Sequence, residues 1–163
     1  MVMLFENGYF EVDLLKSDAI VAVTRTAKSF ESLPDAHRAC EPMIATLDAL
    51  GRASHYLLLD SREAVGKNDP EYELWFARFR KELVAGFPRT AVVVRTVAGQ
   101  LQSRRLLRAD NAEENAGIFV DIGAALEFLR AGRKNLRQGS NRPLPRQPQP
   151  STVPKSSRSF PSE

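Results

Sequence analysis

The sequence predicts an α/β domain in which one mixed β-sheet of about five strands is covered by about four helices. The main observation is a short apolar run, residues 56–59, that ends at Asp60 and is followed by a polar loop and an amphipathic helix. A fully apolar run of this length is typical of a strand buried on both faces. The same order of strand, loop and helix recurs further along the chain, which favours parallel strands joined by right-handed crossovers.

Two strands are expected before this unit, over residues 9–15 and 19–26. The first alternates apolar and polar residues, and the second is rich in β-branched residues. Only residues 16–18 separate them, and so short a connection requires an antiparallel hairpin. The sheet is therefore predicted to be mixed. An exposed edge of this hairpin also offers a route to a homodimer.

The first helix is predicted over residues 34–50, with Gly51 as its stop. Cys40, the single cysteine of the chain, lies on its apolar stripe and is interpreted as a core residue; one cysteine excludes an internal disulfide. Pro42 removes a helical hydrogen bond, so we expect a kink or a split near residues 39–41. The apolar stripe is Ala36, Ala39, Cys40, Met43, Ile44, Leu47 and Leu50.

The helix after the central strand begins near Pro70, a residue that suits the first helical position. Asn68 or Asp69 is expected to cap its first turn. The loop over residues 61–69 is then predicted at the carboxyl ends of the parallel strands, where such folds usually bind their ligands. The helix carries a heavy stripe that we expect to cover the sheet: Tyr72, Trp75, Phe76, Phe79 and Leu83.

Two more strands are predicted, over residues 90–94 and 117–121, each followed by a helix. The last helix is expected over residues 122–130, ended by Gly132. Residues 133–163 are rich in proline and basic residues and have too little apolar surface to fold. The chain is therefore predicted to consist of a domain over residues 1–132 and a disordered basic tail.

This succession of elements resembles the STAS domain superfamily, and within it the SpoIIAA-like branch. The residues that carry the resemblance are YLLLDSR at 56–62, the aromatic helix, TAVVV at 90–94, and IFVD at 118–121 followed by AALEFL at 124–129. It covers roughly residues 8–131. The resemblance implies the same α/β fold that the pattern of elements predicts.

By this resemblance the protein is a non-enzymatic, cytoplasmic, bacterial regulatory module that binds a protein partner, such as an anti-sigma factor, a regulatory kinase or another signalling component. In the family a serine at the helix start is phosphorylated, but here Asn68 and Asp69 occupy that place. Ser61, at the strand exit, is therefore the candidate phosphosite. The candidate partner-binding residues are Asp60, Ser61, Arg62, Lys67, Asn68, Asp69 and Tyr72.

Two alternatives remain open. The branch is structurally similar to the CRAL-TRIO lipid carriers, which implies a carrier of a small lipid or apolar ligand with a pocket between the aromatic helix and the sheet. The weaker alternative is that the basic tail binds nucleic acid or another acidic surface. The folded part carries more acidic than basic residues, which argues against a nucleic-acid-binding domain. Arg104, Arg105 and Arg108 form a candidate basic contact face, for which a solvated surface is the simpler interpretation.

No pattern in the sequence predicts an enzyme, a cofactor or a metal site. His37 and His55 lie far apart, and no third ligand is spaced to join them. There is no glycine-rich phosphate loop, nucleophile elbow or dinucleotide fingerprint. No apolar run approaches the roughly 20 residues that cross a bilayer, and the acidic start does not resemble a secretory signal. These features favour a cytoplasmic protein without an integral membrane segment.

Overall fold

The computed structural model describes residues 1–67, 69–109 and 115–139. They form one six-stranded sheet whose strands lie in sequence order. The first three strands pair antiparallel, and the third to the sixth pair parallel. The predicted fold class is confirmed. The strands are β1 (Val2–Glu6), β2 (Phe10–Leu15), β3 (Ile20–Arg25), β4 (Tyr56–Asp60), β5 (Thr90–Val93) and β6 (Ala116–Phe119).

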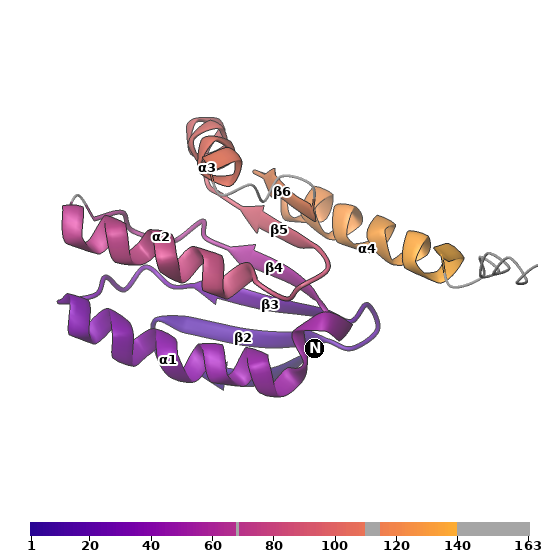
Figure 1. The fold of residues 1–163 in the computed structure, drawn as a ribbon, viewed down its shortest axis with the longest axis horizontal. Coiled ribbons are helices and arrows are strands. Elements are labelled where there is room, and N and C mark those ends of the chain that lie inside the picture. The colour runs from indigo at the N-terminus through magenta and orange to yellow at the C-terminus, as the bar shows by residue number, and fades with distance from the viewer. Residues whose placement is uncertain (68, 110–114, 140–163) are drawn as a thin grey trace, which may run out of the picture.

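The helices cover both faces of the sheet unequally. On one face α1 and α2 lie side by side, α4 packs on the opposite face, and α3 lies at the edge beside β6 (Figure 1). This arrangement follows from right-handed crossovers between strands added in one direction, which keep the connecting helices on one side. The helices are α1 (Leu33–Leu50), α2 (Pro70–Val84), α3 (Val97–Ala109) and α4 (Ile122–Gly139), with a short 3₁₀ turn at Arg52–Ser54.

Strand β1 is an addition to the predicted elements. It pairs with β2 from Val2 opposite Leu14 to Glu6 opposite Glu11. Its residues are almost all apolar and do not alternate with polar ones, so periodicity carried no signal for it. The turn between β1 and β2 is held by the Asn7 side chain, whose Oδ1 accepts hydrogen bonds from the backbone N–H groups of Tyr9 and Phe10.

Helix α1 runs through Pro42 without interruption, so the helix is not split there. The buried residues of the stripe lie on both sides of Pro42, and their shared packing against the sheet outweighs the cost of one lost hydrogen bond, about 3 kcal/mol. Cys40 lies in this core, as predicted, and burial raises the pKa of its thiol to about 12. Gly51, at a φ of 86°, ends the helix.

Strand β4 is buried on both faces because its side chains enter two different cores. Leu57 packs with α1 and α2, whereas Tyr56 and Leu58 pack with α4. This is what the unbroken apolar run predicted for a central strand. The second core is the smaller one, and its buried members are Ile20, Tyr56, Leu58, Ala91, Val93, Ala125 and Leu129.

Helix α4 does not end at Gly132 but continues to Gly139. Gly132 is buried, and a Cβ atom there would lie 2.6 Å from Nη1 of Arg89. A side chain at this position would force the Arg89 side chain to move, and Gly132 is not a helix stop. The predicted boundary between domain and tail falls inside this helix, and residues 140–163 of the predicted tail lie outside the described residues. None of the described helices is both long and apolar enough to span a membrane.

Candidate functional site

An apolar groove of about 630 Å³ opens between α2 and α3. Its floor is formed by side chains of the four parallel strands, its longer wall by the aromatic residues of α2, and its shorter wall by Gln102 and Ser103 of α3. The loop over residues 61–67 lies at one end. Sites for small molecules in proteins usually measure about 300–1,000 Å³ and are lined mainly by apolar side chains. The floor residues are Val23, Leu59, Val92, Val94 and Ile118.

The wall formed by α2 begins at a well-capped helix start. The Asp69 side chain accepts hydrogen bonds from the backbone N–H groups of Glu71 and Tyr72, and Pro70 follows it, as predicted. The Tyr72 and Phe76 rings stack on each other with centroids 5.8 Å apart, and both line the groove. The Asp69 carboxylate therefore caps α2 and in this way fixes the start of the wall.

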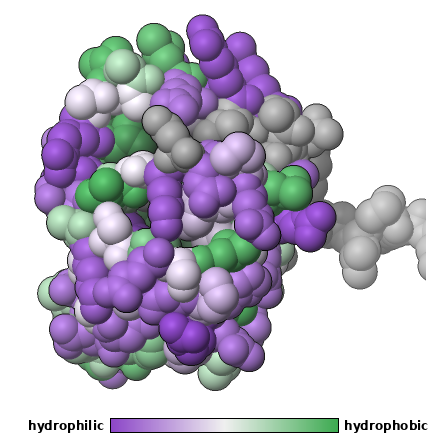
Figure 2. All heavy atoms as spheres, turned by 90° about the vertical axis from the view of Figure 1, so that its left-hand side faces the viewer, coloured by the Kyte–Doolittle hydropathy of each residue, from purple (hydrophilic) through white to green (hydrophobic). Residues whose placement is uncertain are grey.

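The wall formed by α3 is held at its start and stays exposed along its outer side. Gln100 donates a hydrogen bond of 2.8 Å from Nε2 to the carbonyl oxygen of Ile118, which ties α3 to β6. Val97 and Leu101 are 64% and 55% exposed. Figure 2 shows the molecule from the left-hand side of Figure 1. Apolar side chains gather near the top of this view, at the level where α3 lies in Figure 1. The helix therefore borders the groove without closing it.

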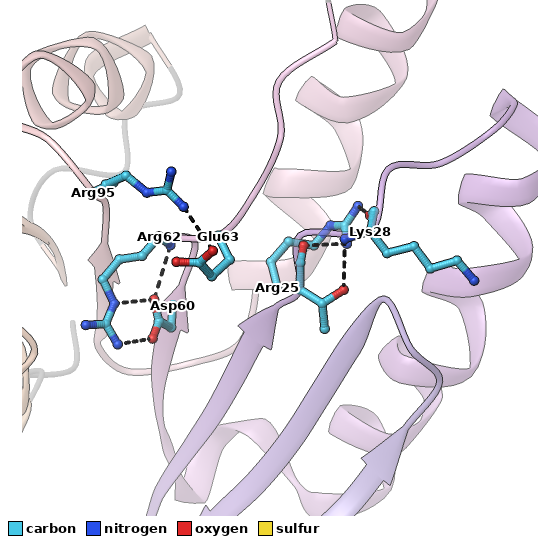
Figure 3. Close-up of polar contacts among 7 residues, drawn as sticks. Arg25, Lys28, Asp60, Arg62, Glu63 and Arg95 are labelled. Atoms are coloured by element: carbon cyan, nitrogen blue, oxygen red, sulfur yellow. Dashed lines mark hydrogen bonds and ion pairs between the residues drawn. The ribbon is translucent and has the colours of Figure 1, made fainter.

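The rim of the groove carries two ion pairs that face each other at the carboxyl ends of β4 and β5 (Figure 3). Arg62 binds Asp60 in a bidentate manner, with Nε at 2.9 Å from Oδ1 and Nη2 at 2.7 Å from Oδ2. Burial alone would raise the pKa of Asp60, but the hydrogen bonds from Arg62 hold it below the ordinary value. Arg95 pairs with Glu63 at 3.0 Å, and both side chains are more than half exposed.

Arg25, at the end of β3, occupies the other side of the rim (Figure 3). Its Nη1 donates to the carbonyl oxygens of Tyr9 and Thr26, and its Nη2 donates to that of Lys28. The guanidinium carbon lies 4.3 Å from the centroid of the Phe30 ring, at a distance typical of cation–π contacts. Burial lowers the pKa of this guanidinium. Arg25 is a half-buried cation held by carbonyl groups and aromatic rings.

The structure separates the predicted site residues into two groups. Asp60, Ser61, Lys67 and Tyr72 line the groove, whereas Arg62 and Asp69 are engaged in an ion pair and a helix cap. Asn68 lies outside the described residues. The predicted basic residues of α3, which are Arg104, Arg105 and Arg108, are exposed.

Sequence reasoning did not include Arg25 among the site residues. The available signal was its place at the end of a strand predicted to precede the central one, because parallel strand ends meet at one edge of a sheet. Its aromatic contacts, Phe10 and Phe30, come from different segments and carry no common pattern in the sequence.

Among the described residues, no three His, Cys, Asp or Glu side chains lie close enough together to hold a metal ion. On one side of the rim Arg62 pairs with Asp60 and Arg95 with Glu63, whereas Arg25 on the other side is held by backbone carbonyl groups. The groove thus offers a shaped apolar surface with a polar rim, an arrangement that suits binding.

Comparisons of the chain with family models, with curated proteins and with solved structures found no match.

Proposed function

We propose that this protein is a non-enzymatic binding protein that takes up a small apolar molecule in the groove between α2 and α3. The observation that carries this proposal is the groove itself, with its volume of about 630 Å³ and its mainly apolar lining. Of the alternatives that the sequence left open, the carrier of an apolar ligand requires such a pocket between the aromatic helix and the sheet.

The position of the groove supports the same proposal. It lies at the carboxyl ends of the parallel strands, the edge at which open α/β sheets usually bind ligands. The aromatic side chains of α2 bury a large area per residue and give the wall a defined shape, since Tyr72 and Phe76 are held by stacking. A bound apolar molecule would remove both this wall and the floor from water.

Replacing Ser103 with phenylalanine is expected to weaken binding of a neutral apolar probe at least about tenfold, because the ring would occupy volume inside the groove. The probe is N-phenyl-1-naphthylamine, and binding is followed by energy transfer from Trp75, the only tryptophan of the chain. Trp75 stacks on Phe79, which lines the groove, so its emission starts close to the bound probe.

The matched control is Arg105→Phe, which adds the same ring to the same helix at an exposed position that does not line the groove. It should bind the probe as the unaltered protein does. A lack of saturable binding to the unaltered protein, or equal binding by the two variants, would contradict the proposal. Native mass spectrometry of gently purified protein should show an apolar adduct that Ser103→Phe loses.

A second candidate function is binding of a protein partner through the loop over residues 61–69, as the resemblance to STAS domains implies. The observation in its favour is the exposed tip of this loop, where Val65 is 53% exposed beside the Glu63–Arg95 pair. An exposed apolar side chain close in sequence to a charged pair suits a small contact surface with a polar rim. Ser61, whose backbone N–H donates to the carbonyl oxygen of Val93, stays the predicted phosphosite of this loop.

Replacing Val65 with aspartate is expected to abolish retention of a host protein by the immobilised full chain, as read by mass spectrometry. Arg62 and Asp69 are poor test positions, because their side chains support the fold. The control is Leu74→Asp, which places the same charge at another exposed apolar residue, 61% exposed on α2. If Val65→Asp retains every protein that Leu74→Asp retains, the loop is not the contact surface.

A further inference from the structure

More basic than acidic side chains line the groove. Its basic lining residues are Arg25, Lys67, Arg80 and Lys81, against two acidic ones, Asp60 and Glu73. The Asp60 carboxylate is already bound by Arg62, which is held in a bidentate ion pair. Along the mainly apolar lining of the groove, basic residues therefore outnumber acidic ones. The inference drawn from this charge rests on the proposed function, because it concerns the ligand of the same groove.

Two of these cations, Arg25 and Lys67, meet at Phe30 although they come from different elements. The Arg25 guanidinium lies over the Phe30 ring, and Lys67 donates from Nζ to the Phe30 carbonyl oxygen at 3.2 Å. Neither forms an ion pair with a carboxylate of the described residues. Cations that are partly removed from water are usually balanced by an anion, so this pair of like charges lacks its ordinary complement.

Tyr72 adds a neutral hydrogen-bond donor at the same place. The centroid of its ring lies 6.3 Å from the centroid of the Phe30 ring. The same centroid lies 5.9 Å from Nζ of Lys67. Burial raises the pKa of its hydroxyl group, which therefore stays protonated at neutral pH. This hydroxyl makes no hydrogen bond to the described residues. A guanidinium, an ammonium and a phenol are the donors that carboxylate and phosphate groups accept from.

A purely structural role for Arg25 accounts for only part of this arrangement. Its three hydrogen bonds to carbonyl oxygens fasten the segment that follows β3, but they use three of the five N–H donors of a guanidinium. Such a role also gives no reason for a second cation from another loop, Lys67, to bind the backbone carbonyl of the same residue, Phe30, beside the groove.

We infer that the groove binds an anionic amphiphile, whose apolar chain lies along α2 and whose carboxylate or phosphate head group is held by Arg25, Lys67 and Tyr72 beside Phe30. The aromatic wall takes the chain, and the two unbalanced cations take the charge. A neutral amphiphile fills the same apolar space without this compensation, and a cationic one meets repulsion from the same two side chains.

The test compares four ligands with the same dodecyl chain and different head groups: dodecanoate, dodecyl phosphate, dodecanol and dodecyltrimethylammonium. Binding to the full chain is measured by calorimetry at neutral pH, below the concentrations at which the ligands form micelles. We expect dodecanoate or dodecyl phosphate to bind at least about tenfold more tightly than dodecanol, and dodecyltrimethylammonium to bind most weakly. Whichever of the two anions binds more tightly identifies the head group.

Lys67→Met is the main variant, because Lys67 makes a single hydrogen bond to the described residues and methionine keeps the apolar stem. It should reduce the preference for the anionic ligands several-fold and leave dodecanol binding unchanged. Arg25→Lys, which keeps the charge and loses the planar fork, is the second variant and should also reduce the preference. The control is Lys16→Met, an exposed lysine before β3 at the opposite edge of the sheet.

The outcomes separate this inference from the proposed function. If dodecanol binds as tightly as the anions, or if Lys67→Met matches Lys16→Met, the anionic head-group site is refuted while the apolar groove stands. If none of the four ligands binds, both the groove function and the inference fail. A preference for dodecyltrimethylammonium would refute the inference alone.

Discussion

Replacing Leu129 with alanine is expected to lower the free energy of unfolding by about 3–5 kcal/mol. Leu129 is fully buried, and it is the larger of the two fully buried side chains, with Ala125, by which α4 enters the second core. Figure 1 shows α4 as the helix that covers this face, so no neighbouring helix is placed to fill the cavity. Urea unfolding followed by far-UV circular dichroism measures the change.

The control for this prediction is Leu74→Ala, which removes the same atoms from a helix position that is 61% exposed. Because little surface is buried there, the free energy of unfolding should change by less than about 0.5 kcal/mol. A loss below about 1 kcal/mol in Leu129→Ala would mean that α4 contributes little to the stability of the sheet, contrary to the packing described above.

Replacing Arg52 with methionine is expected to cost about 2–3 kcal/mol of unfolding free energy. Its Nε pairs with Asp48, near the end of α1, at 2.6 Å. The side chain is only 12% exposed, so water does not replace these bonds freely. Its Nη1 donates to three carbonyl oxygens at the end of α2, those of Glu82, Leu83 and Ala85. These carbonyls have no partner within the helix, and a cation at this end also favours the helix dipole.

Thermal unfolding compares Arg52→Met with Arg38→Met, a control in which the lost arginine is 73% exposed and forms a long ion pair with Asp35. An exposed pair of this kind contributes little, so Arg38→Met should unfold close to the unaltered protein. Arg52→Lys should be intermediate, because an ammonium keeps the charge but does not reach several carbonyls with one planar group. Equal midpoints for the two methionine variants would show that the carbonyl contacts are not needed.

Local patterns were sufficient to predict most elements of the fold. The apolar run at 56–59, the cap and proline at Asp69 and Pro70, and the aromatic stripe of α2 each depend on residues within one turn or one strand. The order of these elements then restricted the topology, since parallel strands joined by helices have a preferred handedness. For the same reason the sequence predicts a binding site at the carboxyl edge of the sheet, where the candidate groove lies.

The errors arose where packing overrides a local signal. Pro42 indicates a kink or a split, and the split is absent, because a stripe buried on both sides of Pro42 keeps α1 in one piece. Gly132 was interpreted as a helix stop, whereas it makes room for Arg89 inside a longer helix. Strand β1 has no alternation and gains its conformation from pairing with β2.

By itself the amino-acid sequence determined the fold class, the course of the chain through the sheet and the capped aromatic helix, because these follow from periodicity and from short-range hydrogen bonding. The tertiary structure alone decided the groove, because its volume depends on how far α3 lies from α2. It also decided the meeting of Arg25 and Lys67 at Phe30, since the segment over residues 25–30 and the loop that carries Lys67 are distant in sequence and must first fold onto one edge of the sheet.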